Sequence, residues 1–215
     1  MSFKVRSNHP YAHAARLPEG RVEIGSLFEA SGPIEVEIGP GRGGFLFERA
    51  AARPEALLLG FEIRLKWSAL VDERLAKAGL RSRARVLNGD AKEALARLDP
   101  DASVEVFYLH FPDPWWKKRH AKRLVMSPVL LASIARLLKD GGELFVQTDV
   151  EERALEYGAQ IAEHADFEPL GDVEGSARLA ENPYGARSPR EHHAIADGLP
   201  VHRLRYRRLA RRAAG

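Results

Sequence analysis

The sequence contains no cysteine among its 215 residues. Disulfide bonds, thiolate zinc sites and cysteine nucleophiles are therefore excluded. A chain without disulfides fits a reducing compartment. The first residues hold no apolar core of the kind that a secretory signal needs, and no apolar run approaches the length of a membrane-spanning helix. We therefore expect a soluble, cytoplasmic protein.

The chain also has little excess charge of either sign. Its 33 Lys and Arg residues nearly balance 30 Asp and Glu residues, which leaves a formal net charge of +3. Any argument for an anionic partner therefore depends on where the basic residues lie. Hydrophobic residues make up 45% of the chain, enough for one domain with a sizeable core. We expect a basic N-terminal arm at residues 1–30 and a single domain at residues 31–215.

From Gly32 onward, short apolar runs alternate with segments of helical periodicity. Strands are predicted at residues 34–38, 56–63, 84–87, 104–111, 144–148, 167–170 and 201–209. Helices are predicted at residues 45–52, 67–78, 91–98, 128–138 and 151–164, with a short one in the arm near 26–30 and a loop at 171–189. This alternation predicts an α/β fold, a mostly parallel sheet covered by helices on both faces. Ligands of such sheets bind outside the carboxyl ends of the strands.

The first predicted strand leads into a glycine-rich turn. Glu37 precedes the run Gly39-Pro40-Gly41-Arg42-Gly43-Gly44. Glycines let the backbone turn sharply and approach a ligand closely, although such a run alone is shared by several kinds of nucleotide site. A carboxylate ahead of these glycines suits a cationic methionine moiety better than a pyrophosphate.

Acidic residues also end the next four predicted strands. They are Glu62, Asp90, Asp113 and Asp149. Glu62 lies about twenty residues beyond the glycines, where an acidic residue accepts bonds from ribose hydroxyls. Asp90 suits an adenine amino group, and it suits a helix N-cap equally well. Each residue alone has a structural explanation, but together they predict a pocket for a ligand with several hydroxyl or amino donors.

The segment 111–123 has the most distinctive composition, Phe-Pro-Asp-Pro-Trp-Trp-Lys-Lys-Arg-His-Ala-Lys-Arg. Two prolines restrict the backbone on either side of Asp113. The cations that follow form either a solvated loop or a phosphate-binding surface. Their adjacency to Asp113 and to two tryptophans favours phosphate binding and a polyanionic partner. Trp115 suits stacking on a base, whereas packing explains Trp116 better.

Five motifs together resemble the bacterial tRNA (guanine-N7)-methyltransferases. They are Glu37-Ile38-Gly39-Pro40-Gly41-Arg42-Gly43, Gly60-Phe61-Glu62, Asp90-Ala91, the segment 111–123 and Thr148-Asp149. The resemblance runs from about Gly32 to Leu209. It implies a Rossmann-like, seven-stranded class I methyltransferase fold with an antiparallel last strand, and S-adenosylmethionine as the methyl donor without a metal. It also implies that the target is a variable-loop guanine of tRNA, position 46, and that the protein is a monomer or weak homodimer with no obligate protein partner.

The resemblance further implies roles for individual residues. Donor contacts are implied for Glu37, Gly39, Gly41, Glu62, Asp90 and Asp113. Substrate contacts are implied for Lys117, Arg119, His120, Ala121, Lys122, Arg123, Leu124, Asp149, Ser188 and Glu191. Asp113 meets both ligands and is the candidate catalytic residue. Pro189 and Arg190 depart from the family's Thr-x-aromatic-Glu pattern, so no stacking contact is carried over to them.

The implied chemistry needs little from the protein. Guanine N7 carries a lone pair and no proton at neutral pH, so its attack on a sulfonium methyl requires no general base. The sequence accordingly offers no convincing Ser-His-Asp or metal constellation, and His192-His193 is better explained as a solvated pair. We expect Asp113 to orient guanine through N1 and the exocyclic amino group, and to stabilise charge that moves onto the base.

Three other functions stay open. One is a class I methyltransferase that acts on another RNA base, a protein or a metabolite. Another is a nicotinamide dehydrogenase, which Glu37 and the crowded glycines disfavour. The third is a non-catalytic RNA-binding protein on the same fold, which the intact acidic strand ends disfavour. The last strand adds Arg203, Arg205 and Arg207 at alternate positions, and these must reach either solvent and RNA or acidic partners.

Overall fold

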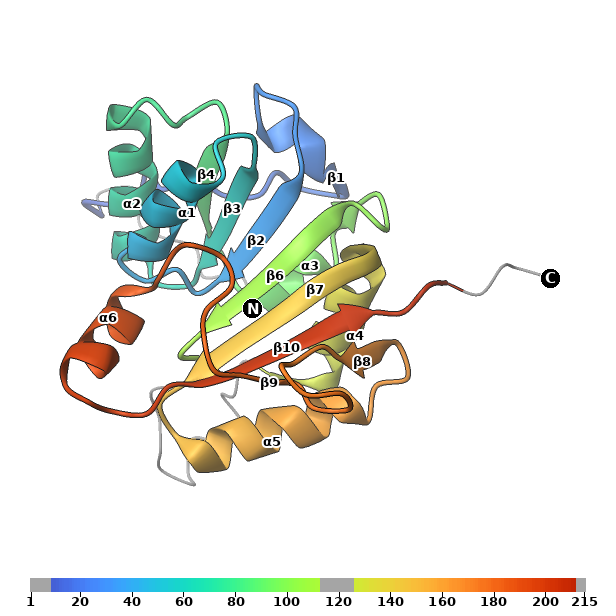
Figure 1. The fold of residues 1–215 in the computed structure, drawn as a ribbon. Coiled ribbons are helices and arrows are strands. Elements are labelled where there is room, and N and C mark those ends of the chain that lie inside the picture. Colours follow the sequence, from blue (N-terminus) through green and yellow to red (C-terminus); the bar gives the residue numbers. More distant parts are fainter. Residues whose placement is uncertain (1–8, 113–125, 212–215) are drawn as a thin grey trace.

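A central sheet organises the molecule, which the computed structural model describes over residues 9–112 and 126–211. Its strand order is β4, β3, β2, β6, β7, β10, β8, with β9 also paired to β10 (Figure 1). The strands are β2 (Ile34–Ile38), β3 (Leu57–Glu62), β4 (Ala84–Asn88), β6 (Val104–His110), β7 (Leu138–Thr148), β8 (Phe167–Pro169), β9 (Arg178–Leu179) and β10 (His202–Arg208). The first five are parallel, and β10 runs antiparallel to β7, β8 and β9. The predicted α/β fold with an antiparallel last strand is confirmed.

Helices cover both faces of the sheet. They are α1 (Gly44–Ala52), α2 (Leu65–Lys77), α3 (Ala91–Leu95), α4 (Pro128–Leu137), α5 (Glu151–Ala162) and α6 (Pro189–Ala196). Apolar side chains of α3, α4 and α5 share one core with the sheet, and those of α1 and α2 share a second core on the other face. None of the helices in the described residues has the length and apolar character needed to cross a membrane.

Strands β2 and β3 are buried along their whole length, and β6 is buried except at Glu105. Val36, Leu59 and Phe107 have no exposed surface, and they come from three adjacent strands. Helix α4 begins where Ser127 accepts a hydrogen bond from the Leu130 amide (3.3 Å) and Pro128 takes the first helical position.

The N-terminal arm departs from the sequence prediction. The helix expected near residues 26–30 is instead a 3-10 turn, η1 (Ile24–Leu27), because the amides of Glu29 and Ala30 donate to the Ser82 carbonyl. Just before it, β1 (Val22–Glu23) pairs in parallel with β5 (Leu98–Asp99). The β1–β5 pairing also ends α3 three residues before the predicted boundary.

Helix α6 begins at Pro189, where the segment predicted as a loop ends. Ser188 caps it by accepting from the Glu191 amide (3.2 Å), and Pro189 is its first residue. This is the same Ser-Pro start as in α4. A methyl group on Gly44 would lie 2.4 Å from Pro189, so α6 packs directly against the start of α1.

Candidate functional site

The carboxyl ends of the parallel strands meet at one edge of the sheet. The glycine turn follows β2 there, Glu62 ends β3, Asp90 follows β4, and Asp149 follows β7. The parallel pairing of β4, β3, β2, β6 and β7 brings these ends together although they are spread over more than half of the sequence.

The turn after β2 has a backbone that requires glycine. Gly39, Gly41 and Gly43 have φ of +75°, +58° and +76°. A methyl group on Gly43 would lie 2.3 Å from Cγ1 of Val71 on α2, whereas one on Gly39 would meet nothing within 4 Å. The turn is thus packed tightly at Gly43 and open at Gly39, where a ligand has room to approach.

Glu37, at the end of β2, is buried and only partly satisfied. Its Oε1 lies 2.8 Å from Nδ1 of His110 on the neighbouring strand β6. Its Oε2 and the Nε2 of His110 are both buried and have no hydrogen-bond partner among the described residues. A buried carboxylate oxygen without a donor is costly, so this pair indicates a place for a donor-rich, cationic ligand group.

Glu62 is buried and holds the glycine turn in place. Its Oε2 accepts from the Gly41 amide (2.9 Å), and its Oε1 accepts from the amide and Nε of Arg64 (2.9 and 3.0 Å). The Arg64 side chain is 60% exposed and can move aside without disturbing the core. The Glu62 carboxylate therefore lies where hydroxyl groups of a ligand can replace the Arg64 guanidinium.

Asp90 caps α3, as one of its two predicted roles requires. Its Oδ1 accepts from the Lys92 amide (2.9 Å), and the residue is exposed. Beside it lies a cavity of about 130 Å³, lined by Ile38, Gly39, Phe61, Ile63, Gly89, Asp90, Ala91 and Lys92. Apolar walls with a carboxylate at the rim suit a flat heterocycle that carries an amino group.

The predicted substrate residues near the C-terminus have different environments. Arg190 donates from Nε to Oδ2 of Asp149 (3.0 Å); the Arg190 side chain is exposed, and that of Asp149 is partly buried. Ser188 is buried as the cap of α6. Glu191 is fully buried, where it accepts from Arg203 (2.9 Å) and Asn182 (2.9 Å).

The arginines of β10 meet acidic partners. Arg203 pairs with Glu191 (2.9 Å), Arg205 lies 4.0 Å from Glu143, and Arg207 lies 3.4 Å from Glu168. Of the two possibilities that the sequence left open, the structure selects pairing within the protein.

Several predicted site residues lie outside the described residues. They are Asp113, Lys117, Arg119, His120, Ala121, Lys122, Arg123 and Leu124. The chain enters this segment through Phe111, whose φ of +47° is uncommon for a residue with a side chain and which turns the backbone at the end of β6.

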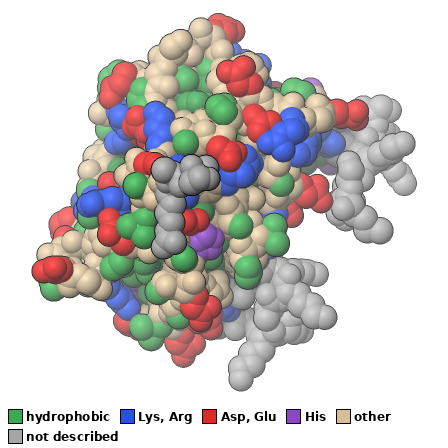
Figure 2. All heavy atoms as spheres, turned by 90° about the vertical axis from the view of Figure 1, so that its right-hand side faces the viewer, with side chains coloured by type: hydrophobic (Ala, Val, Ile, Leu, Met, Phe, Trp, Pro, Cys, Tyr) green, Lys and Arg blue, Asp and Glu red, His purple; other side chains and the backbone are tan. Residues whose placement is uncertain are grey.

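Basic and acidic side chains are interspersed on the described surface. Figure 2 shows one face on which Lys and Arg groups lie beside Asp and Glu groups, with hydrophobic residues scattered between them. The described side chains on this face therefore do not form a uniformly basic surface.

Sequence reasoning missed His110 and Gln147. They are in-register neighbours on β6 and β7, and both are buried. Both polar atoms of the Gln147 amide lack a partner among the described residues. Side chains alternate between the two faces of a strand, and this pattern could have found His110. His110 lies two residues beyond Tyr108, so both point to the same face of the sheet. Glu37 lies on that face too, because it is paired with Tyr108.

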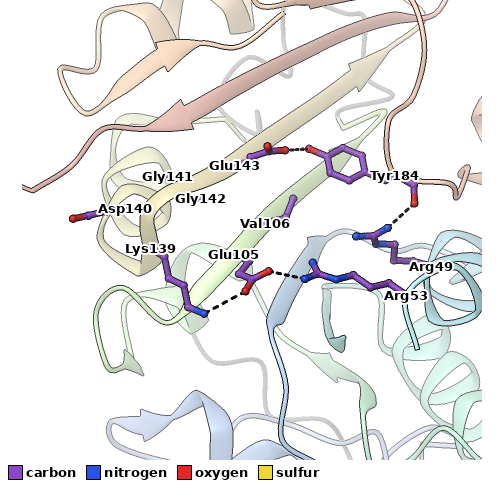
Figure 3. A pocket seen from close by; sticks show the side chains of 10 residues that line it. All are labelled: Arg49, Arg53, Glu105, Val106, Lys139, Asp140, Gly141, Gly142, Glu143 and Tyr184. Atoms are coloured by element: carbon purple, nitrogen blue, oxygen red, sulfur yellow. Dashed lines mark hydrogen bonds and ion pairs between the residues drawn. The ribbon is translucent and has the colours of Figure 1, made fainter. Parts of the chain in front are cut away.

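A larger cavity, about 410 Å³, lies at the opposite edge, where β6 and β7 begin. Figure 3 shows that its polar side chains bond to each other: Arg53 forms an ion pair with Glu105 (2.9 Å), and the Tyr184 hydroxyl donates to Glu143 (2.6 Å). Burial, reinforced by the Glu143 carboxylate, raises the pKa of Tyr184 well above its usual range. We interpret this cavity as part of a structural network of ion pairs and hydrogen bonds, because most of the polar side chains drawn in Figure 3 already bond to one another.

The described part of the chain holds no group of three or more His, Asp or Glu placed to bind a metal ion. The polar groups at this edge of the sheet are carboxylates, glycine amides and the imidazole of His110. Such a set suits an organic ligand with ammonium, hydroxyl and amino groups.

Comparison with known proteins gives a consistent result. A family model described as "Putative methyltransferase" matches residues 31–204. The tRNA (guanine-N(7)-)-methyltransferase of Anaeromyxobacter dehalogenans is 39% identical over 206 residues, which cover 95% of this chain and 98% of the relative. The enzyme of the same name from Myxococcus xanthus is 38% identical over 179 residues, which cover 83% of this chain and 84% of that relative. The crystal structure of TrmN from Thermus thermophilus has a similar fold, with a TM-score of 0.57 at 17% identity, and covers 84% of this chain and 45% of that one.

Proposed function

The chain belongs to the family of the tRNA (guanine-N(7)-)-methyltransferases, and from that premise we propose that it methylates N7 of the guanine at position 46 of tRNA. S-adenosylmethionine is the methyl donor. The observation that supports the site most strongly is the row of Glu37, the open glycine turn, Glu62 and Asp90 along one sheet edge. The reaction takes place in the cytoplasm, where tRNA is available.

Each part of this edge matches one part of the donor. Glu37 Oε2, buried and unpartnered among the described residues, accepts from the ammonium of the methionine moiety. Glu62 accepts from the ribose hydroxyls once Arg64 moves aside, as its exposure permits. The 130 Å³ cavity holds the adenine ring, and Asp90 at its rim accepts from the exocyclic amino group. Gly39 and Gly41 let the backbone lie close to the donor.

Catalysis consists mainly of positioning. The bound donor supplies an electrophilic methyl group, and guanine N7 carries the lone pair that attacks it. Holding two reactants in line contributes roughly 7–11 kcal/mol. Asp113 accepts from N1 and the exocyclic amino group of guanine, which fixes the base and stabilises the positive charge that the ring acquires. The protein therefore needs no general base.

The tRNA is held by the basic segment and by the end of β7. The run Arg119 to Leu124 contacts the RNA, and the cations in and beside it bind phosphates. Lys117 and Asp149 contact the substrate. Ser188 and Glu191 contribute by building α6, because Ser188 caps the helix and Glu191 is buried against Arg203. Their effect on tRNA is therefore indirect.

The test uses labelled S-adenosylmethionine with two unmodified tRNA transcripts, one with guanine at position 46 and one with adenine there. We expect label in N7-methylguanosine for the first transcript only. Label in N7-methylguanosine from both transcripts would show that position 46 is not the target. Label in another nucleoside, or no label at all, would contradict the proposed guanine-N7 methylation.

Two variants separate the proposed roles. Asp113→Asn should reduce methyl transfer at saturating S-adenosylmethionine much more than it weakens S-adenosylhomocysteine binding. Lys118→Ala with Arg123→Ala should weaken tRNA binding and reduce its salt slope by about two units, because each cation removed leaves about one phosphate unneutralised. Equal losses of donor and tRNA affinity would contradict both assignments.

A further inference from the structure

The buried pair of Glu37 and His110 joins the two halves of the sheet beside the glycine turn. β2 and β6 are neighbours in the sheet, and the pair connects residues 73 positions apart. Both side chains are 3% exposed, and Oε1 of Glu37 lies 2.8 Å from Nδ1 of His110. The pair therefore belongs to the protein interior and is not a surface contact.

The His110 ring is held in place by its neighbours. The ring of Phe45, on α1, lies 4.2 Å from it between centroids, and the ring of Tyr108 stacks at 5.5 Å. Phe145 approaches edge-on at 6.0 Å. An imidazole packed in this way cannot rotate freely, so its Nδ1 stays directed at Glu37.

The donor and acceptor capacity of each polar atom shows which ligand group would complement the pair. A carboxylate only accepts, so in the neutral imidazole the proton is on Nδ1 and His110 donates to Glu37 Oε1. The two remaining polar atoms, Glu37 Oε2 and His110 Nε2, are both acceptors, and both are buried without a partner among the described residues. Of these two, Glu37 Oε2 carries the negative charge, and it complements a primary ammonium group, which has three donors and a positive charge.

We infer that His110 is a positioning residue for the donor's ammonium group and acts through Glu37. By binding Oε1 it fixes the rotation of the carboxylate, so that Oε2 is the oxygen presented to the ligand. This inference rests on the proposed donor site. It adds a residue that contributes to affinity for the amino-acid end of the donor and not for its adenosine end.

The test compares two ligands by calorimetry: S-adenosylhomocysteine and its des-amino analogue, which lacks only the ammonium group. His110→Ala should weaken S-adenosylhomocysteine about ten-fold, in line with the loss of one charged hydrogen bond. It should leave the des-amino analogue unchanged. His110→Asn keeps an N–H donor at the Nδ1 position and should restore much of the affinity. His164→Ala, beside Asp166 (3.8 Å) at the end of α5, is the matched control and should change neither ligand.

A double-mutant cycle supplies a second readout. Glu37→Gln should weaken S-adenosylhomocysteine on its own, and His110→Asn or His110→Ala in that background should add little. Fully additive losses, or equal losses for both ligands, would show that His110 only supports the fold and would overturn the inference. If the unmodified protein bound neither ligand, the proposed donor site itself would be wrong, which is a distinct outcome.

Discussion

Arg190 and Asp149, 41 residues apart, form an ion pair at the edge of the sheet where tRNA is proposed to bind. The Arg190 guanidinium donates from Nε (3.0 Å) and from Nη2 to the same oxygen of Asp149, Oδ2. The side chains are 52% and 18% exposed. Arg190 thus neutralises a carboxylate that would otherwise repel phosphates, although it departs from the pattern of the family.

Removing Arg190 should therefore weaken tRNA binding. Arg190→Ala deletes one positive charge and leaves Asp149 unneutralised, so we expect a higher tRNA Kd and a salt slope reduced by about one unit. Protein stability should change by only about 0–1 kcal/mol, because the Arg190 side chain is half exposed. Titrations of tRNA at several salt concentrations measure the effect. Arg21→Ala, from the exposed pair with Asp99, is the control, and an unchanged slope for Arg190→Ala would contradict the prediction.

Glu191 should matter for stability more than for tRNA contact. It has no exposed surface and accepts from Nε and Nη2 of Arg203 (3.1 and 2.9 Å). Glu191→Ala leaves a buried guanidinium without its carboxylate, which costs about 3–5 kcal/mol. Urea unfolding measures this loss.

A matched pair and a rescue variant complete that experiment. Glu151→Ala breaks an exposed pair with Arg178 (2.9 Å) and should cost at most about 1 kcal/mol. Replacing both buried partners, Glu191→Leu with Arg203→Met, should recover much of the stability. A Glu191→Ala protein as stable as Glu151→Ala would show that the buried pair is not important for the fold.

The periodicity of the sequence was sufficient to predict the sheet and the edge at which the carboxyl ends of its parallel strands meet. Mostly apolar runs predicted the parallel strands and β8, β10 was predicted although arginines alternate along it, and β9 was not predicted. Each acidic strand end follows directly from a strand boundary. Glu37, Glu62, Asp90 and Asp149 were therefore found from local signals, because parallel strands bring their carboxyl ends to one edge.

Features that depend on distant partners were not predictable in this way. The two-residue pairing of β1 with β5 and the contact of His110 with Glu37 join segments more than 70 residues apart. The burial of Arg203 likewise depends on Glu191, which lies on a helix that the sequence analysis missed. That helix was predictable, since Ser188-Pro189 repeats the Ser127-Pro128 start, but the surrounding Gly, Pro and Asn favoured a loop.

Two buried tyrosines should make the protein sensitive to alkaline pH. Burial raises the pKa of Tyr108 well above its ordinary value, with a further contribution from the Glu35 carboxylate, to which its hydroxyl donates (2.9 Å). The pKa of Tyr184 is raised in the same way by burial and Glu143. At a pH above about 10, both phenols stay protonated in the folded protein, whereas the same phenols ionise in the unfolded chain. Stability is therefore complete below a pH of about 10 and falls above it, by about 1.4 kcal/mol per pH unit for each tyrosine.

Urea unfolding from about pH 8 to about pH 11 measures that slope. The double variant Tyr108→Phe with Tyr184→Phe should be less stable at neutral pH, because Glu35 and Glu143 lose hydrogen bonds, but its stability should decline less steeply above about pH 10. Tyr11→Phe, on the N-terminal arm, controls for loss of a phenol elsewhere. A double variant with the same slope as the unmodified protein would exclude these two tyrosines as the cause.

Asp90 should have two separable roles, one in the fold and one in donor binding. It caps α3 by accepting from the Lys92 amide (2.9 Å), and it lies at the rim of the proposed adenine cavity. Asp90→Ala removes both functions and should cost about 1 kcal/mol of stability as well as donor affinity. Asp90→Ser keeps a capping oxygen but removes the charged acceptor, so thermal unfolding should stay near that of the unmodified protein while S-adenosylhomocysteine binds more weakly. The decisive comparison uses inosine in place of adenosine in that ligand: inosine lacks the exocyclic amino group, so Asp90→Ser should no longer weaken binding. If it weakened both ligands equally, Asp90 would act only as a helix cap that shapes the cavity.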